Sequence, residues 1–165
     1  YDAQGTSPDG TYTVNNVHLY SCEGYAFSIT ASGYSIEKGE LTNSNVIIGN
    51  LGDTVSKAIT GIKSLTGASA VTITSSNGSS VSTSSKIATG MKVSVGGTTY
   101  NLVIKGDTNC DGAVTMDDSV RVYQHLLGTS RLSGAASDAA KMNRASNSIT
   151  ILDVMQIIDI VNSLV

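Results

Sequence analysis

The chain has 165 residues, of which 40% are hydrophobic and 14% charged, and its formal net charge at pH 7 is -3. Its ten Lys and Arg residues form no basic stripe, so nucleic acid is not an expected partner. No apolar run approaches the roughly 18 residues of a membrane-spanning helix. The length fits one or two small domains, and the low charge is common in secreted bacterial modules. Because the chain starts at Tyr1 without a signal peptide, we expect a mature segment or a fragment.

Residues 1–16 contain the single proline, Pro8, and little apolar periodicity, which predicts a tail or linker. Residues 17–104 have a mainly β pattern. Short β-branched and aromatic runs occur at residues 17–21 and 25–31, and apolar residues alternate with polar ones at 91–95 and 100–104. Asn77-Gly78 and Gly96-Gly97 predict hairpin turns, so residues 71–76 should pair with the segment after them and residues 91–95 with 98–104.

One helix is expected between these strands, at residues 52–67. Asp53 or Thr54 is a suitable N-cap and Gly67 a suitable end. The first module is therefore predicted to be a β-rich, sandwich-like or grasp-like unit with one helix. The apolar face of that helix consists of Val55, Ala58, Ile59, Ile62 and Leu65.

After Lys105 the sequence contains an internal repeat. Two helical patterns, residues 119–127 and 154–164, each follow a loop rich in Asp, Asn and Ser, and an offset of 35 residues places Asp118 on Asp153. A single loop-helix unit cannot bury its apolar face alone, so we expect the helices to pack antiparallel, joined through a turn or short helix at residues 131–140. The predicted fold class is α+β, with an all-α, duplicated EF-hand-like C-terminal part at residues 105–165. No linker separates this part from residues 17–104, so the two modules should pack together.

The first loop has the ligand spacing of a calcium site. Calcium takes about six to eight oxygen ligands, which alternating acidic and amide side chains can supply, whereas magnesium prefers a strict octahedron with several waters. Gly112 permits a sharp turn, Val114 anchors the loop in the core, and Thr115 is placed to hold a water. The predicted calcium ligands are Asp107, Asn109, Asp111, Ala113 through its backbone carbonyl, and Asp118.

The second loop departs from this pattern. Lys141 stands where the first acid should be, and one extra residue precedes Asp153. Counted backward from Asp153, Ile149 takes the apolar anchor position and Asn147 the glycine position. With one carboxylate an ion would be held weakly, and a metal-free turn kept in shape by polar side chains is the favoured interpretation. The candidates for a weak second site are Asn143, Asn147 and Asp153.

The stretch GDTNCDGAVTMDDSVRVYQHLLG resembles the first repeat of a dockerin, the duplicated module that binds cohesin domains in cellulosomes, amylosomes and related bacterial assemblies. The resemblance covers residues 105–165, strongly in the first repeat and weakly in the second. Residues 17–104 resemble the X-type β-modules that precede some dockerins. The resemblance implies calcium at the same five positions. It also implies a non-catalytic protein, secreted or at a bacterial cell surface, that binds a cohesin of a scaffold or cell-surface protein in a polysaccharide-degrading complex.

The resemblance also implies a partner-binding face at loop positions 10 and 11 and on the outer helix faces. Many dockerins have polar pairs at these loop positions, whereas this chain has Met116-Asp117 and Ile151-Leu152, so we expect a cohesin of a less common type. The two faces differ, which predicts a single binding mode. The implied partner residues are Met116, Asp117, Val120, Tyr123, Gln124, Leu127, Ile151, Leu152, Ile158 and Asp159.

Two other interpretations remain open. Tyr20, Tyr25 and Tyr34 would suit a carbohydrate-binding module attached through the dockerin, although the absence of Trp favours core or surface tyrosines. Alternatively, the repeat is an intramolecular clasp without an external partner.

The remaining reactive side chains point to no enzyme activity. His18 and His125 have no catalytic partner at a recognised spacing. Cys22 and Cys110 either form a disulfide or are unrelated thiols. The resemblance places Cys110 at a loop position usually occupied by glycine.

Overall fold

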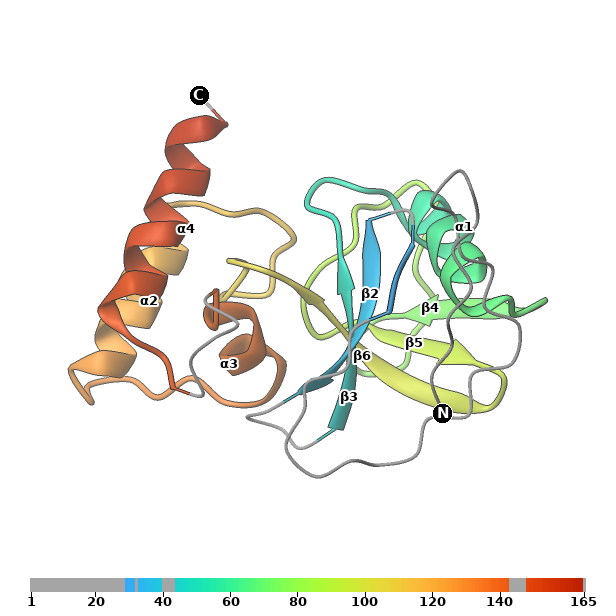
Figure 1. The fold of residues 1–165 in the computed structure, drawn as a ribbon, viewed down its shortest axis with the longest axis horizontal. Helices are drawn as coiled ribbons and strands as arrows, with labels where there is room; N and C mark the ends of the chain where they lie inside the picture. Colours follow the sequence, from blue (N-terminus) through green and yellow to red (C-terminus); the bar gives the residue numbers. More distant parts are fainter. Residues whose placement is uncertain (1–28, 32, 40–43, 143–147, 165) are drawn as a thin grey trace, which may run out of the picture.

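The computed structural model describes residues 29–31, 33–39, 44–142 and 148–164 (Figure 1). These residues form a mixed α+β fold, with one sheet in the first part of the chain and a group of helices in the last part. The predicted tail at residues 1–16 and the predicted strand at residues 17–21 lie outside the described residues. None of the described helices is long and apolar enough to cross a membrane.

The described strands form one six-stranded sheet in the order β1-β2-β3-β6-β5-β4. Strands β3 and β6 run parallel, and the other neighbours run antiparallel. The sandwich-like or grasp-like arrangement stays a prediction, because residues 1–28 lie outside the description. The strands are β1 (Ile29–Ala31), β2 (Tyr34–Gly39), β3 (Ser44–Gly49), β4 (Val71–Thr74), β5 (Lys92–Val95) and β6 (Thr98–Ile104).

The hairpin predicted at Gly96-Gly97 is confirmed. Both glycines have positive φ, 56° and 87°, and they connect β5 to β6, where Val95 pairs with Thr98. Glycine adopts this region without the penalty that a Cβ imposes.

The turn predicted at Asn77-Gly78 is also present, but its pairing is confirmed only in part. Beyond the turn a single bridge joins Thr74 to Ser80, and β4 pairs along its length with β5 instead. The serine-rich segment at residues 79–85 lacks an apolar alternation to continue the buried face of β4, whereas β5 supplies the fully buried Val93.

Helix α1 (Val55–Thr66) covers one face of the sheet. The Thr54 hydroxyl accepts a hydrogen bond from the Lys57 N–H, and Gly67 ends the helix at a φ of 67°, so a predicted cap is present at each end. From the predicted apolar face, Val55, Ala58 and Ile62 are buried, while Ile59 and Leu65 are partly buried against the same core. This core lies between α1 and the sheet and also contains Tyr34, Ile47, Val71, Ile73, Ile87, Val93, Leu102 and Ile104.

Helix α3 (Gly134–Ala140) packs on the sheet from the C-terminal part of the chain. Its Ala139 forms a second buried cluster with Val46, Ile48 and Val103. Successive side chains of a strand point to opposite faces, so β3 and β6 are buried on both faces. The alternation at residues 100–104 predicted only one buried face, because the second depends on a helix some thirty residues further along the chain.

Helices α2 (Met116–Leu126) and α4 (Ile151–Ser163) lie side by side and run in opposite directions, as expected (Figure 1). Each helix begins three residues before its predicted start, at 116 instead of 119 and at 151 instead of 154. The predicted starts were wrong because Thr115 and Thr150 are the N-caps, which places Asp118 and Asp153 inside the first turn in capping boxes. The helical core consists of Val114, Val122, Ala140, Val154 and Ile157.

The two parts of the chain are joined directly. The Lys105 ammonium donates hydrogen bonds to the backbone carbonyls of Asp138, at 2.9 Å, and Lys141, at 2.8 Å. The Gly106 N–H donates to the Ala139 carbonyl at 2.9 Å. Leu51, in the loop after β3, packs against both the sheet core and the helical core. The expected packing of the two modules is therefore present.

Candidate calcium loop and exposed helix face

The loop at residues 107–118 turns at two left-handed positions. Gly112 has a φ of 82°, and a Cβ there would lie 2.7 Å from the Ile87 carbonyl oxygen, so both conformation and space require glycine. Cys110 has a φ of 66° and is the only non-glycine residue with positive φ in the part of the chain that the structure describes. Left-handed backbone costs a residue with a side chain about 1–3 kcal/mol. This explains why glycine suits the Cys110 position.

Asp107, the first predicted ligand, is fully buried. Its Oδ1 accepts a hydrogen bond from the Asp111 N–H at 3.0 Å, and its Oδ2 accepts from Gly112 at 3.1 Å and from Thr89 at 2.9 Å. Burial raises the pKa of Asp107 above its ordinary value, and these hydrogen bonds only partly offset that effect. The β-module thus contributes one donor, from Thr89, to the first residue of the loop.

Asn109 and Asp111 form the outer side of the loop. The Asn109 Nδ2 donates to the Asp111 Oδ2 at 2.7 Å, and the Asn109 Oδ1 accepts from the Asp111 N–H at 3.0 Å. The Asp111 Oδ1 accepts from the Ala113 N–H at 2.8 Å. Asp111 and Ala113 are exposed, so this side of the loop opens to solvent.

Asp118, the last predicted ligand, is also fully buried. Its Oδ1 accepts hydrogen bonds from the backbone N–H groups of Thr108, at 2.8 Å, and Asn109, at 3.0 Å. Its Oδ2 accepts from the Thr115 N–H at 2.8 Å. One carboxylate therefore ties the beginning of the loop to the first turn of α2.

Four of the predicted ligands would use side-chain oxygens, and all four side chains take part in hydrogen bonds within one loop. Their oxygen atoms are of the kind that calcium prefers. These residues are Asp107, Asn109, Asp111 and Asp118. In the described part of the chain, no three His, Cys, Asp or Glu side chains already form a group that could hold a metal ion. The carboxylates of Asp107 and Asp118 are engaged with backbone N–H groups instead. The kinds of ligand atom in the loop suit calcium, whereas the arrangement of the side chains that carry them is set by hydrogen bonds.

The second loop is described only at its ends. Ile149 packs partly buried against the helical core, as the anchor position requires. Asp153 is fully buried, and it accepts hydrogen bonds from the Met142 N–H through Oδ1 and from the Thr150 N–H through Oδ2, both at 2.7 Å. Lys141 is buried as well, with 6% of its surface exposed. Asn143 and Asn147, two of the predicted ligands, lie outside the described residues.

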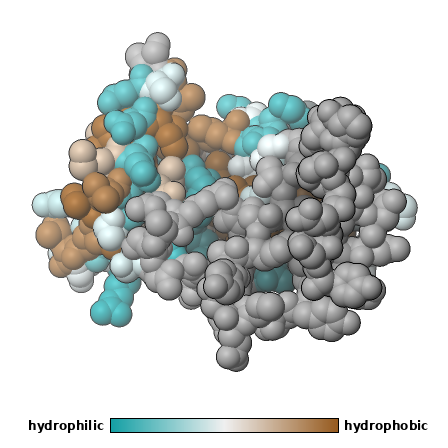
Figure 2. Space-filling model, in the orientation of Figure 1, coloured by the Kyte–Doolittle hydropathy of each residue, from teal (hydrophilic) through white to brown (hydrophobic). Residues whose placement is uncertain are grey.

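The helix pair carries a group of exposed apolar side chains, visible in Figure 2 as hydrophobic atoms over α2 and α4. Nine of the ten predicted partner residues are exposed, and Ile158 is partly buried against the helical core. The large apolar members are each about half exposed. They are Met116, Val120, Tyr123, Leu127, Ile151 and Leu152.

Sequence reasoning missed two sets of residues near these features. Met155 is 55% exposed on α4, and the repeat alignment that places it on Val120 could have identified it. Ile87 and Thr89, which contact the candidate calcium loop from the β-module, carry no local signal in the sequence. We refer to Met116, Val120, Tyr123, Leu127, Ile151, Leu152 and Met155 as the apolar face.

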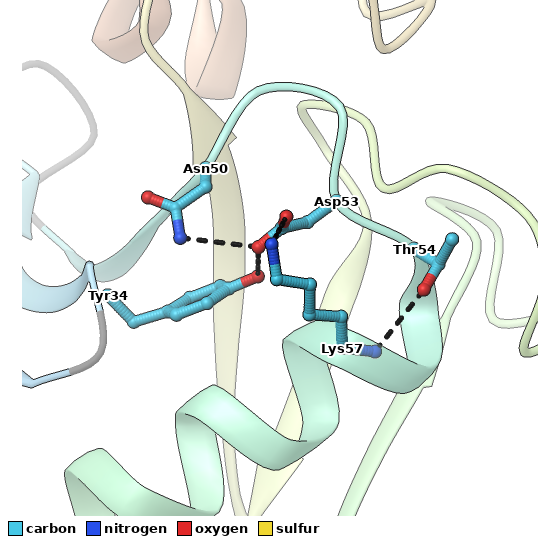
Figure 3. Close-up of polar contacts among 5 residues, drawn as sticks. All are labelled: Tyr34, Asn50, Asp53, Thr54 and Lys57. Atoms are coloured by element: carbon cyan, nitrogen blue, oxygen red, sulfur yellow. Dashed lines mark hydrogen bonds and ion pairs between the residues drawn. The ribbon is translucent and has the colours of Figure 1, made fainter.

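Tyr34 belongs to a buried polar cluster at the start of α1 (Figure 3). Its hydroxyl donates to the Asp53 Oδ2 at 2.7 Å, and the same carboxylate accepts from Asn50 and pairs with the Lys57 ammonium at 2.7 Å. Burial, followed by the hydrogen bond to Asp53, raises the pKa of Tyr34 above its ordinary value. Burial alone would raise the pKa of Asp53, but hydrogen bonds from Lys57, Tyr34 and Asn50 lower it overall. Tyr34 is therefore a core residue, while Tyr20 and Tyr25 lie outside the described residues.

The structure also describes two other reactive side chains, those of His125 and Cys110. The His125 Nδ1 accepts a hydrogen bond from the Leu132 N–H at 3.1 Å. Cys110 is exposed. Cys22 and His18 lie outside the described residues, so the disulfide stays a prediction.

Comparisons with known proteins gave no further identification: no protein-family model, curated protein or solved structure matches this chain.

Proposed function

We propose that residues 105–165 form a dockerin-like, calcium-dependent module that binds a cohesin domain, and that residues 17–104 form an X-like β-module that supports it. The chain would attach to an extracellular or cell-surface bacterial complex that degrades polysaccharide, without catalysis of its own. The observation that carries the proposal is the position of Asp118. It is the last acid of the candidate calcium loop and also lies in the first turn of α2, between the exposed residues Met116 and Val120.

The loop supports calcium because of its charge. Residues 107–118 contain four aspartates and no Lys or Arg, and two of those aspartates, Asp107 and Asp118, are fully buried. Buried like charges are costly unless a cation or hydrogen bonds compensate them. A calcium ion would neutralise them and take the side-chain oxygens of Asp107, Asn109, Asp111 and Asp118. Because Asp118 also caps α2, metal binding and the position of the helix would be coupled.

The apolar face supports a protein partner. Contiguous exposed apolar side chains are unfavourable in water and often mark interaction sites. The face is not symmetric, since Asp117 on α2 corresponds to Leu152 on α4, and the exposed Tyr123 corresponds to the partly buried Ile158. A partner fitted to one helix would not fit the other equally, which favours one binding mode.

Calcium titration by calorimetry tests the first step. Asp111→Ala should weaken calcium binding by about tenfold or more, whereas Asp117→Ala, at another exposed acid next to the loop's last proposed ligand, should leave it unchanged. Asp111 and Asp117 are both on the surface, so neither change should unfold the chain. Absence of binding by the wild type, or an equal loss in both variants, would contradict the calcium site.

Capture of the chain by a panel of cohesin domains, with calcium or with chelator, tests the second step. We expect capture only with calcium. Val120→Asp and Met155→Asp are a matched pair at equivalent positions of the two repeats, and in a single binding mode one abolishes capture while the other has little effect. If each variant alone is captured normally and only the double variant fails, the module binds in two orientations. If no cohesin is captured, the intramolecular clasp becomes the better interpretation.

A further inference from the structure

The four methionines of the chain differ in their exposure to solvent, and all four lie among the described residues. Met91 packs partly buried against the sheet core, and Met142 packs partly buried against the helical core. Met116 and Met155 are instead 48% and 55% exposed. Both of these exposed methionines belong to the apolar face.

The apolar face carries one methionine on each of its two helices. Met116 is the first residue of α2, and Met155 lies in α4, which packs beside α2. In the repeat alignment Met116 corresponds to Ile151 and Met155 to Val120, so each repeat has a methionine where the other has a β-branched residue. A partner that binds through either helix would therefore meet one thioether.

A methionine thioether is apolar, but its sulfur remains open to oxidation. A lone pair of the sulfur attacks one oxygen of hydrogen peroxide, the O–O bond breaks, and the second oxygen leaves as water after proton transfer. The sulfur is oxidised to a sulfoxide while the peroxide is reduced. The sulfoxide is polar and disrupts methionine-containing interfaces, and methionine sulfoxide reductases reverse the change.

The local structure indicates that a sulfoxide at these positions leaves the helices intact. The Met116 carbonyl accepts the Ser119 hydroxyl at 2.7 Å, and the capping box of Thr115 and Asp118 holds the same turn of α2. These contacts use the backbone and the neighbouring polar side chains. Because the thioethers of Met116 and Met155 lie on the surface, an added oxygen there can be solvated without opening a core.

We propose that Met116 and Met155 form a peroxide-sensitive modification site, at which sulfoxide formation makes the apolar face polar and reversibly weakens binding of its partner. The effect on a partner rests on the proposed function, whereas the selective oxidation and the loss of apolar surface do not. Docking would then respond to oxidants without a change of fold.

Site-resolved mass spectrometry of the full chain during exposure to dilute hydrogen peroxide tests the modification. Met116 and Met155 should be oxidised about fivefold or more faster than Met91 and Met142, because susceptibility follows exposure. When only the two exposed methionines are modified, retention on a hydrophobic-interaction column should fall and the midpoint of thermal unfolding should not change. Equal oxidation rates at the four sites, unchanged retention, or a clearly lower midpoint would overturn the proposal.

Capture by a cohesin in calcium, before and after peroxide, tests the effect on a partner. Binding should weaken about tenfold, since a sulfoxide buried without a hydrogen-bond donor is costly, and methionine sulfoxide reductases should restore it. The double variant Met116→Leu with Met155→Leu remains apolar but forms no sulfoxide. Whatever its own level of capture, peroxide should leave that level unchanged, whereas the control Met91→Leu should remain sensitive.

Undiminished capture of the chain oxidised at both sites would overturn the proposal, and so would a loss that persists in the double leucine variant. Both cysteines are retained in every variant, so the comparison assigns the effect to methionine. If no cohesin captures the unoxidised chain, the proposed function fails instead. The oxidation rates and the column retention then still decide whether Met116 and Met155 control the polarity of the apolar face.

Discussion

At the scale of single residues, three of the buried aspartates lie at the starts of helices and hold them in place. Asp53 fixes the start of α1 through Tyr34, Asn50 and Lys57, and Asp118 and Asp153 fix the starts of α2 and α4. Each is satisfied by several donors, as a buried carboxylate must be. Sequence spacing identified Asp118 as a candidate calcium ligand, and its calcium role stays a prediction. The hydrogen bond between Asp53 and Tyr34 was not predictable, because the two residues are brought together only when β2 packs against α1.

Tyr34→Phe tests the polar cluster at the start of α1. The variant should lose about 1–2 kcal/mol of unfolding free energy at neutral pH, because the buried Asp53 loses one donor. Since the pKa of Tyr34 is raised in the folded state, the contribution of its neutral hydroxyl is complete below about pH 10 and declines as the pH rises above that value. The difference between wild type and variant, measured by denaturant unfolding, should therefore shrink in alkali. Tyr100→Phe, at a partly buried tyrosine of β6, is the control, and a difference that does not change with pH would contradict the prediction.

At the scale of secondary-structure elements, the sequence correctly predicted the helix ends and turns that depend on a few neighbouring residues. Thr54 and Gly67 end α1, and Gly96-Gly97 turn the β5-β6 hairpin, because a few neighbouring residues decide each feature. The starts of α2 and α4 were predicted three residues too late. The predicted loops extended to Asp118 and Asp153, so Thr115 and Thr150 were assigned to the loops and not recognised as N-caps. The position of α3 on the sheet could not be predicted, because its short, alanine-rich sequence has no distinctive apolar face.

The end of α3 depends on Lys105, and Lys105→Met tests this dependence. The substitution removes a charged donor from the Asp138 and Lys141 carbonyls and should lower the free energy of unfolding by about 2–3 kcal/mol. Amide hydrogen exchange in α3 should accelerate more than exchange in α1. Lys63→Met, in the last turn of α1, is a matched control for a lysine at the end of a helix. Equal effects of the two changes on α3 would show that the Lys105 contacts contribute little.

At the scale of the whole molecule, residues of the β-module hold the candidate calcium loop in place through Thr89 and Ile87. The Thr89 N–H donates to Asp107, while the Thr89 hydroxyl bridges the N–H and carbonyl of Ile104 in β6. Gly112 approaches Ile87 so closely that no side chain fits between them. The missing linker in the sequence indicated that the modules touch. It could not indicate which residues do so, since Thr89 and Asp107 meet across 18 positions of the chain.

This arrangement predicts that calcium stabilises the sheet as well as the helices. A ligand at a hundredfold excess over its Kd adds about 2.7 kcal/mol to the free energy of unfolding of whatever unit unfolds with its site. Because Thr89 links Asp107 to β6, we expect calcium to slow amide exchange at Leu102 and Ile104 as well as in α2, and thermal unfolding to remain a single transition that shifts upward. Chelator should reverse the shift, and Asp111→Ala should weaken it. Two transitions, with calcium moving only the one reported by α2 and α4, would show that the modules unfold independently despite their contacts.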